Sequence, residues 1–419
     1  MSPREVGVLG LWHLGLVTCA GLLERGHRIV AADPDHALVS DLKAGRLPVA
    51  EPGLAEAWAR GLADGKLTVT ASLEALSAVE VAWLTVDTRL RPDGGPDIED
   101  LDQTVNGVPG WPRVLLVSSQ VPVGYCGALL ARLRPRGCSD IGYVPENLRL
   151  GHALADFATP DLLTVGCSAP KVAETVEGLI GAPMHACKLE TAELTKHAVN
   201  SLLATLITFG NGLGDVAEEV GADGREVADL LRRDRRFSPN LPLLPGPAFF
   251  GGTLARDLVA LRDVAGEHGV HLPLLDSVVL SNVQRTGALV DRLSRSVPLE
   301  GATVVLLGYV YKDGTDAMRD APGAQFEHEL TERGATVRVF EPAVAPGNRP
   351  QAWYGTWQAA ASGADAMIMV RPRVLTETEI TELVLACPDA ILLDLWAEMR
   401  GDLSHVIVPG VGAELGSQI

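Results

Sequence analysis

The residues Gly10-Leu-Trp-His-Leu-Gly15 follow an apolar run at 6–9, and a helical pattern begins within them. In a strand–turn–helix unit the first glycine allows a tight turn, and the last lets helix and strand pack closely. The free amides and dipole at the start of the helix favour a pyrophosphate. An acidic residue about 20 positions further on accepts hydrogen bonds from a ribose, and Asp33 follows Gly10 by 23 positions. This segment predicts a dinucleotide site.

Trp12 stands where this motif has its middle glycine, which lets the backbone approach the pyrophosphate. A bulky residue is compatible with the turn if its φ is negative and its side chain points away from the ligand. The alternative is the same strand–turn–helix unit without a dinucleotide. Asp33 favours NAD over NADP, because a carboxylate repels a 2′-phosphate.

Three further side chains could handle a proton or an oxyanion. Glu146 follows a proline at an expected strand end, where α/β enzymes collect functional residues. Lys196 and Asn200 are four positions apart in an apolar helical pattern, so they share one helix face. A cationic donor beside an amide donor suits a developing oxyanion or a tightly held water. The alternative for Lys196 is a solvated side chain on an amphipathic helix.

Two other segments could hold an anion. The glycine-rich residues 245–253 precede a helix in which Asp257 lies one turn after Thr253, and the cationic run 232–236 lies just upstream. Those arginines could clamp an anionic ligand or complement a helix dipole. The block 308–322 also places basic residues after an expected strand.

The elements that must position these residues fall into three regions, which we predict as domains at 1–190, 191–297 and 298–419. In the first, apolar runs at 6–9, 28–32, 79–86, 113–118 and 162–166 alternate with helical patterns. The third repeats this alternation, so both predict α/β domains with doubly wound parallel sheets.

The middle region is predicted to be helical. Its first helix, from Thr191 to about Val220, is apolar over most of its circumference, so it should be buried on several sides. It is either a homodimer interface or a core helix of a monomer.

Composition narrows the function. The 419 residues carry a formal charge of −18, which argues against a nucleic-acid partner and against docking on an anionic membrane. No apolar run reaches the roughly 18 residues that span a bilayer. The six cysteines show neither metal-ligand nor disulfide spacing, so we expect no metal site and a cytoplasmic location.

Together these segments resemble the UDP-glucose/GDP-mannose dehydrogenase family. The resemblance covers nearly the whole chain, in the same order: the Gly10–Gly15 motif, Ser119-Gln-Val-Pro-Val-Gly124, Pro145-Glu146, the Lys196/Asn200 helix, the Gly251-Gly252 loop and the 308–322 block. It implies two Rossmann-like domains joined by a helical dimerisation domain. It also implies NAD, a nucleotide-sugar substrate, most simply a UDP-sugar, and oxidation of the sugar C6 alcohol to an acid through a cysteine thioester.

The resemblance also assigns site residues. The catalytic set is Glu146, Lys196, Asn200, Thr253 and Asp257. The cofactor set is Gly10, Trp12, His13, Leu14, Gly15, Asp33, Thr85, Gln120 and Arg319. The substrate set is Leu148, Arg149, Arg236, Phe249, Gly251, Gly252 and Lys312, with Arg236 reaching a neighbouring subunit.

Three departures change the expected chemistry. Thr253 stands at the position of the family's nucleophilic cysteine, Gln120 replaces a threonine, and Leu150 replaces a second carboxylate. A thiolate is accessible near neutral pH, whereas an unassisted hydroxyl is not. We therefore expect either one oxidation that ends at the aldehyde, or an acid reached through a hydrated aldehyde. The alternatives are a redox-neutral epimerase with tightly held NAD and a non-catalytic binding relative.

Overall fold

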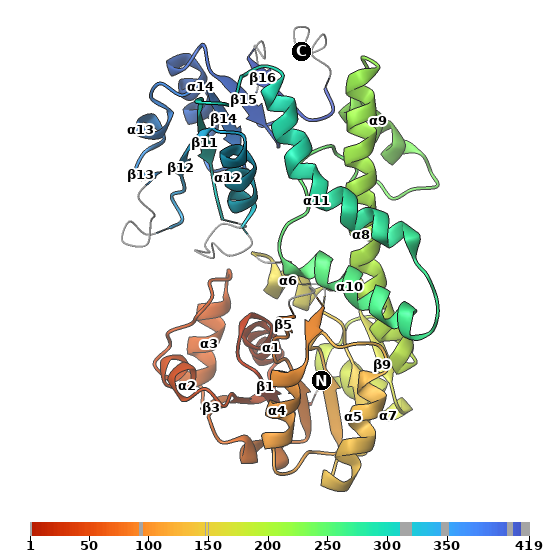
Figure 1. Ribbon diagram of the computed structural model, residues 1–419. Helices are drawn as coiled ribbons and strands as arrows, with labels where there is room; N and C mark the ends of the chain where they lie inside the picture. Colours follow the sequence, from red (N-terminus) through yellow and green to blue (C-terminus); the bar gives the residue numbers. More distant parts are fainter. Residues whose placement is uncertain are drawn as a thin grey trace. The chain divides into compact units, whose positions relative to one another are not determined.

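The computed structural model describes residues 2–91, 95–146, 148–149, 151–310, 321–344, 352–399 and 405–411. The chain folds into two compact units, Met1–Val199 with Val259–Val270, and Asn200–Leu258 with His271–Ile419 (Figure 1). Each unit contains a largely parallel sheet with helices packed against it, which confirms the predicted α/β class. The three-domain division predicted from the sequence stays a prediction.

The first unit is built on an eight-stranded sheet in the order β10-β9-β8-β7-β4-β1-β2-β3. The strands are β1 (Glu5–Leu9), β2 (Arg28–Ala32), β3 (Leu67–Thr70), β4 (Val81–Leu84), β7 (Val114–Val117), β8 (Asp140–Tyr143), β9 (Thr164–Cys167) and β10 (His185–Cys187). Neighbouring strands are parallel except β8 and β9, which are antiparallel. The strand order reverses between β1 and β4, and ligands of open α/β sheets bind at such a point.

The helices of this unit are α1 (His13–Glu24), α2 (His36–Lys43), α3 (Leu54–Ala63), α4 (Glu99–Gly107), α5 (Tyr125–Leu133), α6 (Ala153–Ala158) and α7 (Pro170–Ile180). A short hairpin joins β5 (Arg89–Leu90) to β6 (Pro96–Asp97). The central strands are buried on both faces, because one hydrophobic cluster contains Val8 and Trp83 and another contains Leu9 and Leu84. Continuous apolar runs in the sequence reflect this two-sided burial.

The second unit carries a six-stranded parallel sheet in the order β13-β12-β11-β14-β15-β16. Its strands are β11 (Thr303–Leu307), β12 (Thr336–Phe340), β13 (Trp353–Tyr354), β14 (Ala366–Met369), β15 (Ile391–Asp394) and β16 (Val406–Ile407). Its helices include α9 (Gly224–Arg233), α11 (Pro273–Ser294), α12 (Pro322–Glu332), α13 (Trp357–Ala361) and α14 (Glu377–Ala386). The helices α8 (Leu189–Glu219) and α10 (Gly252–Glu267) contribute to both units.

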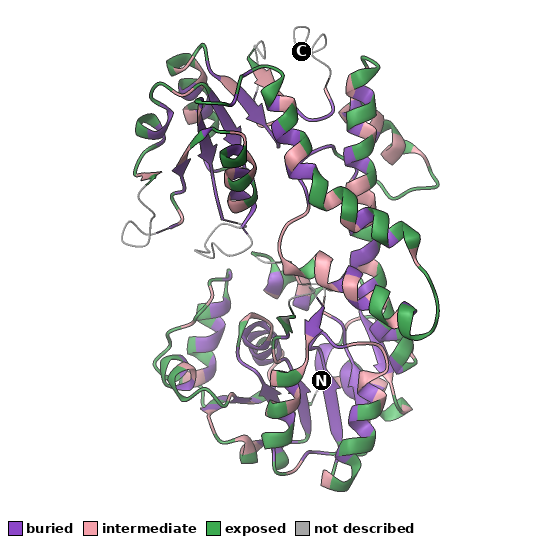
Figure 2. Ribbon diagram, viewed as in Figure 1, coloured by how far each residue is buried: buried purple, intermediate pink, exposed green. Residues whose placement is uncertain are grey.

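The long helix α8 is less buried than one of its two predicted settings requires. Leu202, Phe209 and Val216 are 60%, 57% and 60% exposed, so the alternative that α8 is a core helix of a monomer is wrong. Figure 2 shows exposed stretches along this helix. These residues recur every seventh position and form one apolar stripe. Among the described residues, no helix combines the length and the apolar character needed to cross a membrane.

Candidate active site

The turn between β1 and α1 requires its two glycines. Gly10 has a φ of +96°, and a Cβ there would lie 2.6 Å from the backbone of Val86. A Cβ on Gly15 would lie 1.8 Å from the carbonyl oxygen of Gly10. Trp12 has a φ of −86° and is half exposed, so a bulky side chain fits where the motif has its middle glycine.

Asp33 is fixed at the end of β2 by backbone donors. Its Oδ2 accepts from the N–H of Leu11 at 2.8 Å, and its Oδ1 accepts from the N–H of Asp35 at 2.9 Å. The carboxylate thus lies beside the Gly10 turn, where a ribose hydroxyl can donate to it. The close-packed glycine turn, the start of α1 and Asp33 together fit NAD.

Thr85 has a structural role in the same turn. Its hydroxyl is buried and lies 3.0 Å from the carbonyl oxygen of Leu9 and 2.8 Å from that of Gly10. Thr85 therefore stabilises the glycine turn from the end of β4.

Glu51 is a residue that the sequence analysis missed. Its side chain is fully buried, and its Oε1 lies 2.8 Å from Nε2 of His13 at the start of α1. The N–H groups of Gly151 and Ala153 donate to the same carboxylate. Burial opposes ionisation, but the hydrogen bonds from Gly151 and His13 outweigh it and lower the pKa of Glu51. Glu51 thus ties the cofactor helix to the chain just after Glu146.

Glu146 and Lys196 meet in the first unit. The Nζ of Lys196 donates to the backbone carbonyl of Glu146 at 2.6 Å, and the Lys196 side chain is buried. The Glu146 carboxylate is half-buried and accepts from the N–H of Leu148 at 2.9 Å. A buried ammonium held in one place is a preorganised donor for an oxyanion.

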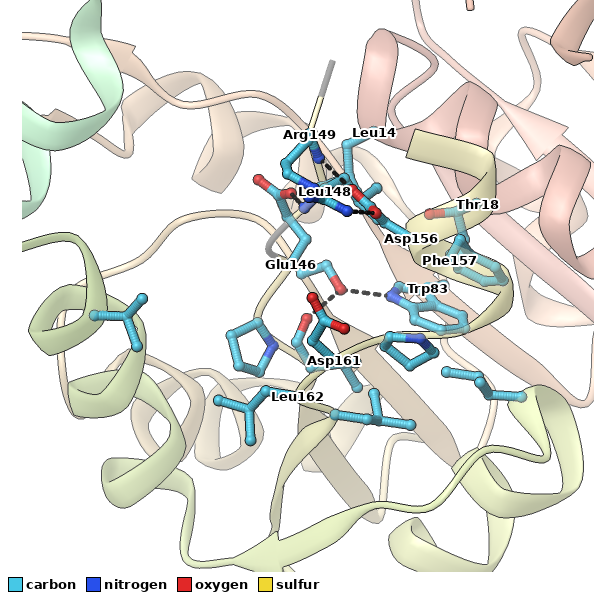
Figure 3. A pocket seen from close by; sticks show the side chains of 17 residues that line it. Leu14, Thr18, Trp83, Glu146, Leu148, Arg149, Asp156, Phe157, Asp161 and Leu162 are labelled. Atoms are coloured by element: carbon cyan, nitrogen blue, oxygen red, sulfur yellow. Dashed lines mark hydrogen bonds and ion pairs between the residues drawn. The ribbon is translucent and has the colours of Figure 1, made fainter. Parts of the chain in front are cut away.

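A cavity of about 280 Å³ lies beside these residues. Leu14 of α1, Glu146, Leu148 and Arg149 line it, so the structure brings four predicted site residues together around one space. Figure 3 shows Arg149 turned towards Asp156, with which it forms an ion pair at 2.6 Å. That exposed ion pair raises the pKa of Arg149 and lowers that of Asp156.

In the second unit, Nδ2 of Asn200 donates to Oδ2 of Asp257, and both side chains are buried. Thr253 is exposed at the start of α10, one turn before Asp257. Gly251 precedes it with a φ of +79°, a conformation that favours glycine. The bond to Asp257 fixes the orientation of the Asn200 amide.

A second cavity, of about 570 Å³, lies within this unit. It is lined by residues 244–250 of the glycine-rich segment, by Trp396 and by three arginines, Arg225, Arg232 and Arg371. The described lining includes no acidic side chain, although the chain as a whole is strongly acidic. Arginines with aromatic side chains suit a ligand that carries phosphates and a planar base.

Other predicted contacts are placed differently. Arg236 is exposed and pairs with Asp234 at 2.6 Å, outside the lining of the second cavity. Gln120 is buried after β7. Lys312 and Arg319, and also Leu150, lie outside the described residues.

No cysteine of this chain, all six of which are described, lines either cavity. Cys19, Cys126 and Cys138 are buried, and burial raises the pKa of Cys138 to about 11. Their thiols are therefore poor nucleophiles. Within the described parts of the chain, no cluster of three or more His, Cys, Asp or Glu side chains is arranged to hold a metal.

Comparisons with known proteins match this chain in three parts. Residues 4–181 match the NAD binding domain of the UDP-glucose/GDP-mannose dehydrogenase family, residues 190–284 its central domain and residues 305–397 its UDP binding domain. The first match confirms NAD as the cofactor.

Individual relatives match over most of their length. UDP-glucose 6-dehydrogenase YwqF of Bacillus subtilis is 31% identical over 383 residues, which is 87% of each chain. GDP-mannose 6-dehydrogenase of Pseudomonas syringae is 29% identical over 80% of each chain. The structure of a UDP-glucose dehydrogenase from Pyrobaculum islandicum is 28% identical, covers 94% of each chain and has a TM-score of 0.81. With its three domains matched in order, the chain belongs to the UDP-glucose/GDP-mannose dehydrogenase family.

Proposed function

We propose that this protein is an NAD-dependent dehydrogenase that oxidises an alcohol of a nucleotide sugar, C6 of a UDP-sugar in the simplest case. The observation that carries the proposal is the second cavity, where Arg225, Arg232 and Arg371 line a space with Phe249 and Trp396. Arginines suit the diphosphate, and aromatic side chains suit the base. Named relatives act on UDP-glucose and GDP-mannose.

The first oxidation needs a group that removes the alcohol proton and donors that stabilise the developing charge. When bound, NAD supplies the hydride acceptor. Lys196, held against the carbonyl of Glu146 at 2.6 Å, either takes the proton directly or leaves that task to Glu146 through a water. Asn200, oriented by Asp257, adds an amide donor. The step converts the alcohol to an aldehyde, with the hydride transferred to NAD and one proton released.

The second oxidation distinguishes this chain. Thr253 occupies the predicted nucleophile position, and a hydroxyl without a base forms no covalent adduct comparable to that of a thiolate. We infer that the product is the aldehyde, or an acid formed through the hydrated aldehyde with Glu146 and Lys196 handling the water.

We further propose a homodimer formed through α8. Leu202, Phe209 and Val216 form an exposed stripe with a seven-residue repeat, the pattern by which two helices pack along a seam. A second copy of the chain would cover the stripe. Because all six cysteines are free thiols, we also propose a reducing compartment, the cytoplasm.

The proposal is tested by incubating the protein with NAD and a panel of UDP-, GDP- and TDP-sugars, with NADH followed by absorbance and products by mass spectrometry. One NADH per sugar and an aldehyde product support the single oxidation. Two NADH per sugar contradict it, and an epimerised sugar without NADH favours the redox-neutral alternative. If calorimetry detects binding of neither NAD nor any nucleotide sugar, both the dehydrogenase and the epimerase hypotheses fail.

Two variants sharpen this test. Thr253→Cys should yield acid if the remaining site supports a thioester, because a thiolate then stands at the nucleophile position. Lys196→Ala should lower kcat by about 100-fold or more if the lysine amine takes the alcohol proton or the ammonium donates to the developing oxyanion. An unchanged kcat would refute that role.

A further inference from the structure

The wall of the second cavity is formed by a loop that lies directly on α8. A Cβ on Gly210 would lie 2.5 Å from the carbonyl oxygen of Leu243, and a Cβ on Gly214 would lie 2.5 Å from the ring of Pro245. These glycines are one turn apart on the same face of α8, so the loop can pack directly against the helix backbone there. A side chain at either position would displace the loop.

Two asparagines hold this loop by paired hydrogen bonds. Asn211 of α8 accepts from the N–H of Gly246 at 2.8 Å and donates to the carbonyl of Pro247 at 3.0 Å. Asn282 of α11 accepts from the N–H of Phe249 at 2.8 Å and donates to the carbonyl of the same residue at 3.1 Å. Each amide uses both its oxygen and its nitrogen, which an aspartate cannot do when ionised.

Arg285 of α11 completes the attachment. Its Nε donates to the carbonyl of Gly246 at 2.9 Å, and its Nη1 pairs with Asp215 at 2.6 Å. The residue is 4% exposed, so its position is set by packing as well as by these bonds. Three side chains from two helices thus satisfy five backbone groups of residues 246–249.

We propose that Asn211, Asn282 and Arg285 are positioning residues that hold residues 245–249 in the shape that binds the nucleotide part of the substrate. The inference rests on the proposed function of the second cavity. A loop fixed before binding pays less conformational entropy when the ligand arrives. Loss of the amide donors should therefore weaken nucleotide binding more than it weakens the fold.

The test uses Asn211→Asp and Asn282→Asp, which keep the size and the acceptor, remove the donor and add a negative charge. Gln358→Glu is the matched control, because it makes the same chemical change at an exposed position of the same unit. The measurements are the Kd of UDP and of UDP-glucose by calorimetry, the Kd of NAD and the urea midpoint of unfolding, all on the full-length chain.

We expect each Asn→Asp variant to raise the Kd of UDP and the Kd of UDP-glucose by about tenfold, equivalent to about 1.4 kcal/mol. The Kd of NAD should stay within about twofold, because Gly10, Gly15 and Asp33 belong to the first unit. The control should match the wild type. In Asn282→Ala, amide hydrogen exchange at Phe249 should accelerate, while exchange in β11 should not.

Each failure has its own signature. If the wild type binds neither UDP nor UDP-glucose, the proposed function fails. If the wild type binds and the Asn→Asp variants bind equally well, the positioning role is refuted and the function stands. If NAD affinity and the urea midpoint fall together with UDP affinity, the three residues serve the fold in general, which also overturns the inference.

Discussion

In both units the first strand of the α/β sheet is followed by a glycine turn of the same geometry, but the residues around the two turns differ. After β1, Gly10 has a φ of +96° and its N–H donates to the carbonyl of Ala32 at 3.0 Å. After β11, Gly308 has a φ of +88° and its N–H donates to the carbonyl of Phe340 at 2.9 Å. In each unit the next strand then ends in an acidic residue, Asp33 in the first and Glu341 in the second.

The difference lies in what surrounds those two carboxylates. Asp33 is half-buried and accepts from two backbone N–H groups. Glu341 is fully buried, accepts from Tyr309, Val310 and Ala343, and pairs with the buried Arg371 at 2.8 Å. The first carboxylate can still receive a ribose hydroxyl, whereas the second is committed to the fold. Similar strand topology therefore does not imply a similar ligand.

The largest effect should come from adding a Cβ to the glycines near the starts of α1 and α12. Gly15→Ala should abolish NAD binding in calorimetry, because the new Cβ would lie 1.8 Å from the carbonyl oxygen of Gly10. Gly323→Ala would place a Cβ 2.4 Å from the ring of Tyr309, so it should destabilise the second unit and leave NAD affinity unchanged. Gly127→Ala, with open space around it in α5, is the control. If Gly15→Ala binds NAD with the wild-type affinity, the glycine turn of the first unit is not needed for the cofactor.

Removing the buried carboxylate of the second unit comes next. Glu341→Gln leaves Arg371 without its buried counterion, which should cost about 3–5 kcal/mol of unfolding free energy in urea denaturation. Asp33→Asn should cost far less, because Asp33 pairs with backbone donors and stays partly exposed. A loss of unfolding free energy below about 1 kcal/mol for Glu341→Gln would show that the Glu341–Arg371 ion pair does not commit this carboxylate to the fold.

Asp33→Asn tests the cofactor side of the comparison. We expect the Kd of NAD to rise by roughly 10- to 100-fold, since a hydrogen bond to a charged acceptor is worth about 1.5–3 kcal/mol. The preference for NAD over NADP should also fall, because the charge that repels the 2′-phosphate is gone. Asp64→Asn, at an exposed position after α3, should change neither value. Equal NAD affinity in both variants would contradict the role of Asp33.

The smallest effect concerns Glu51 and pH. Because the pKa of Glu51 is lowered in the folded chain, its contribution to stability is present above the ordinary carboxyl pKa of about 4.3 and is lost as the pH falls through the lowered value. Glu51→Gln should therefore cost about 1 kcal/mol at pH 7, and the difference from the wild type should vanish in acid. Urea titrations across this range, with Glu56→Gln on α3 as the exposed control, measure it. A difference that does not change with pH would refute the ionic contribution.

The sequence alone determined a large part of this protein. The run at 28–32 is a strand with the predicted bounds, and the helix predicted from Thr191 to about Val220 is α8, Leu189–Glu219. The rest of the region predicted to be helical contains α9, α10 and α11. The sequence analysis did not identify β3, which has four residues and alternates apolar with polar residues. Such a strand has neither a continuous apolar run nor enough length for a periodic signal.

The tertiary structure decided which residues support the site. Gly10, Gly15 and Asp33 were identifiable because their roles depend on local backbone geometry and short spacing. Glu51 meets Gly151 across 100 positions, and Asn211 meets Gly246 across 35. Nothing in the local sequence indicates such partners, because these contacts form only when distant segments pack together. For the same reason, the fold alone shows that Asp33 keeps room for a ligand while Arg371 closes the site of Glu341.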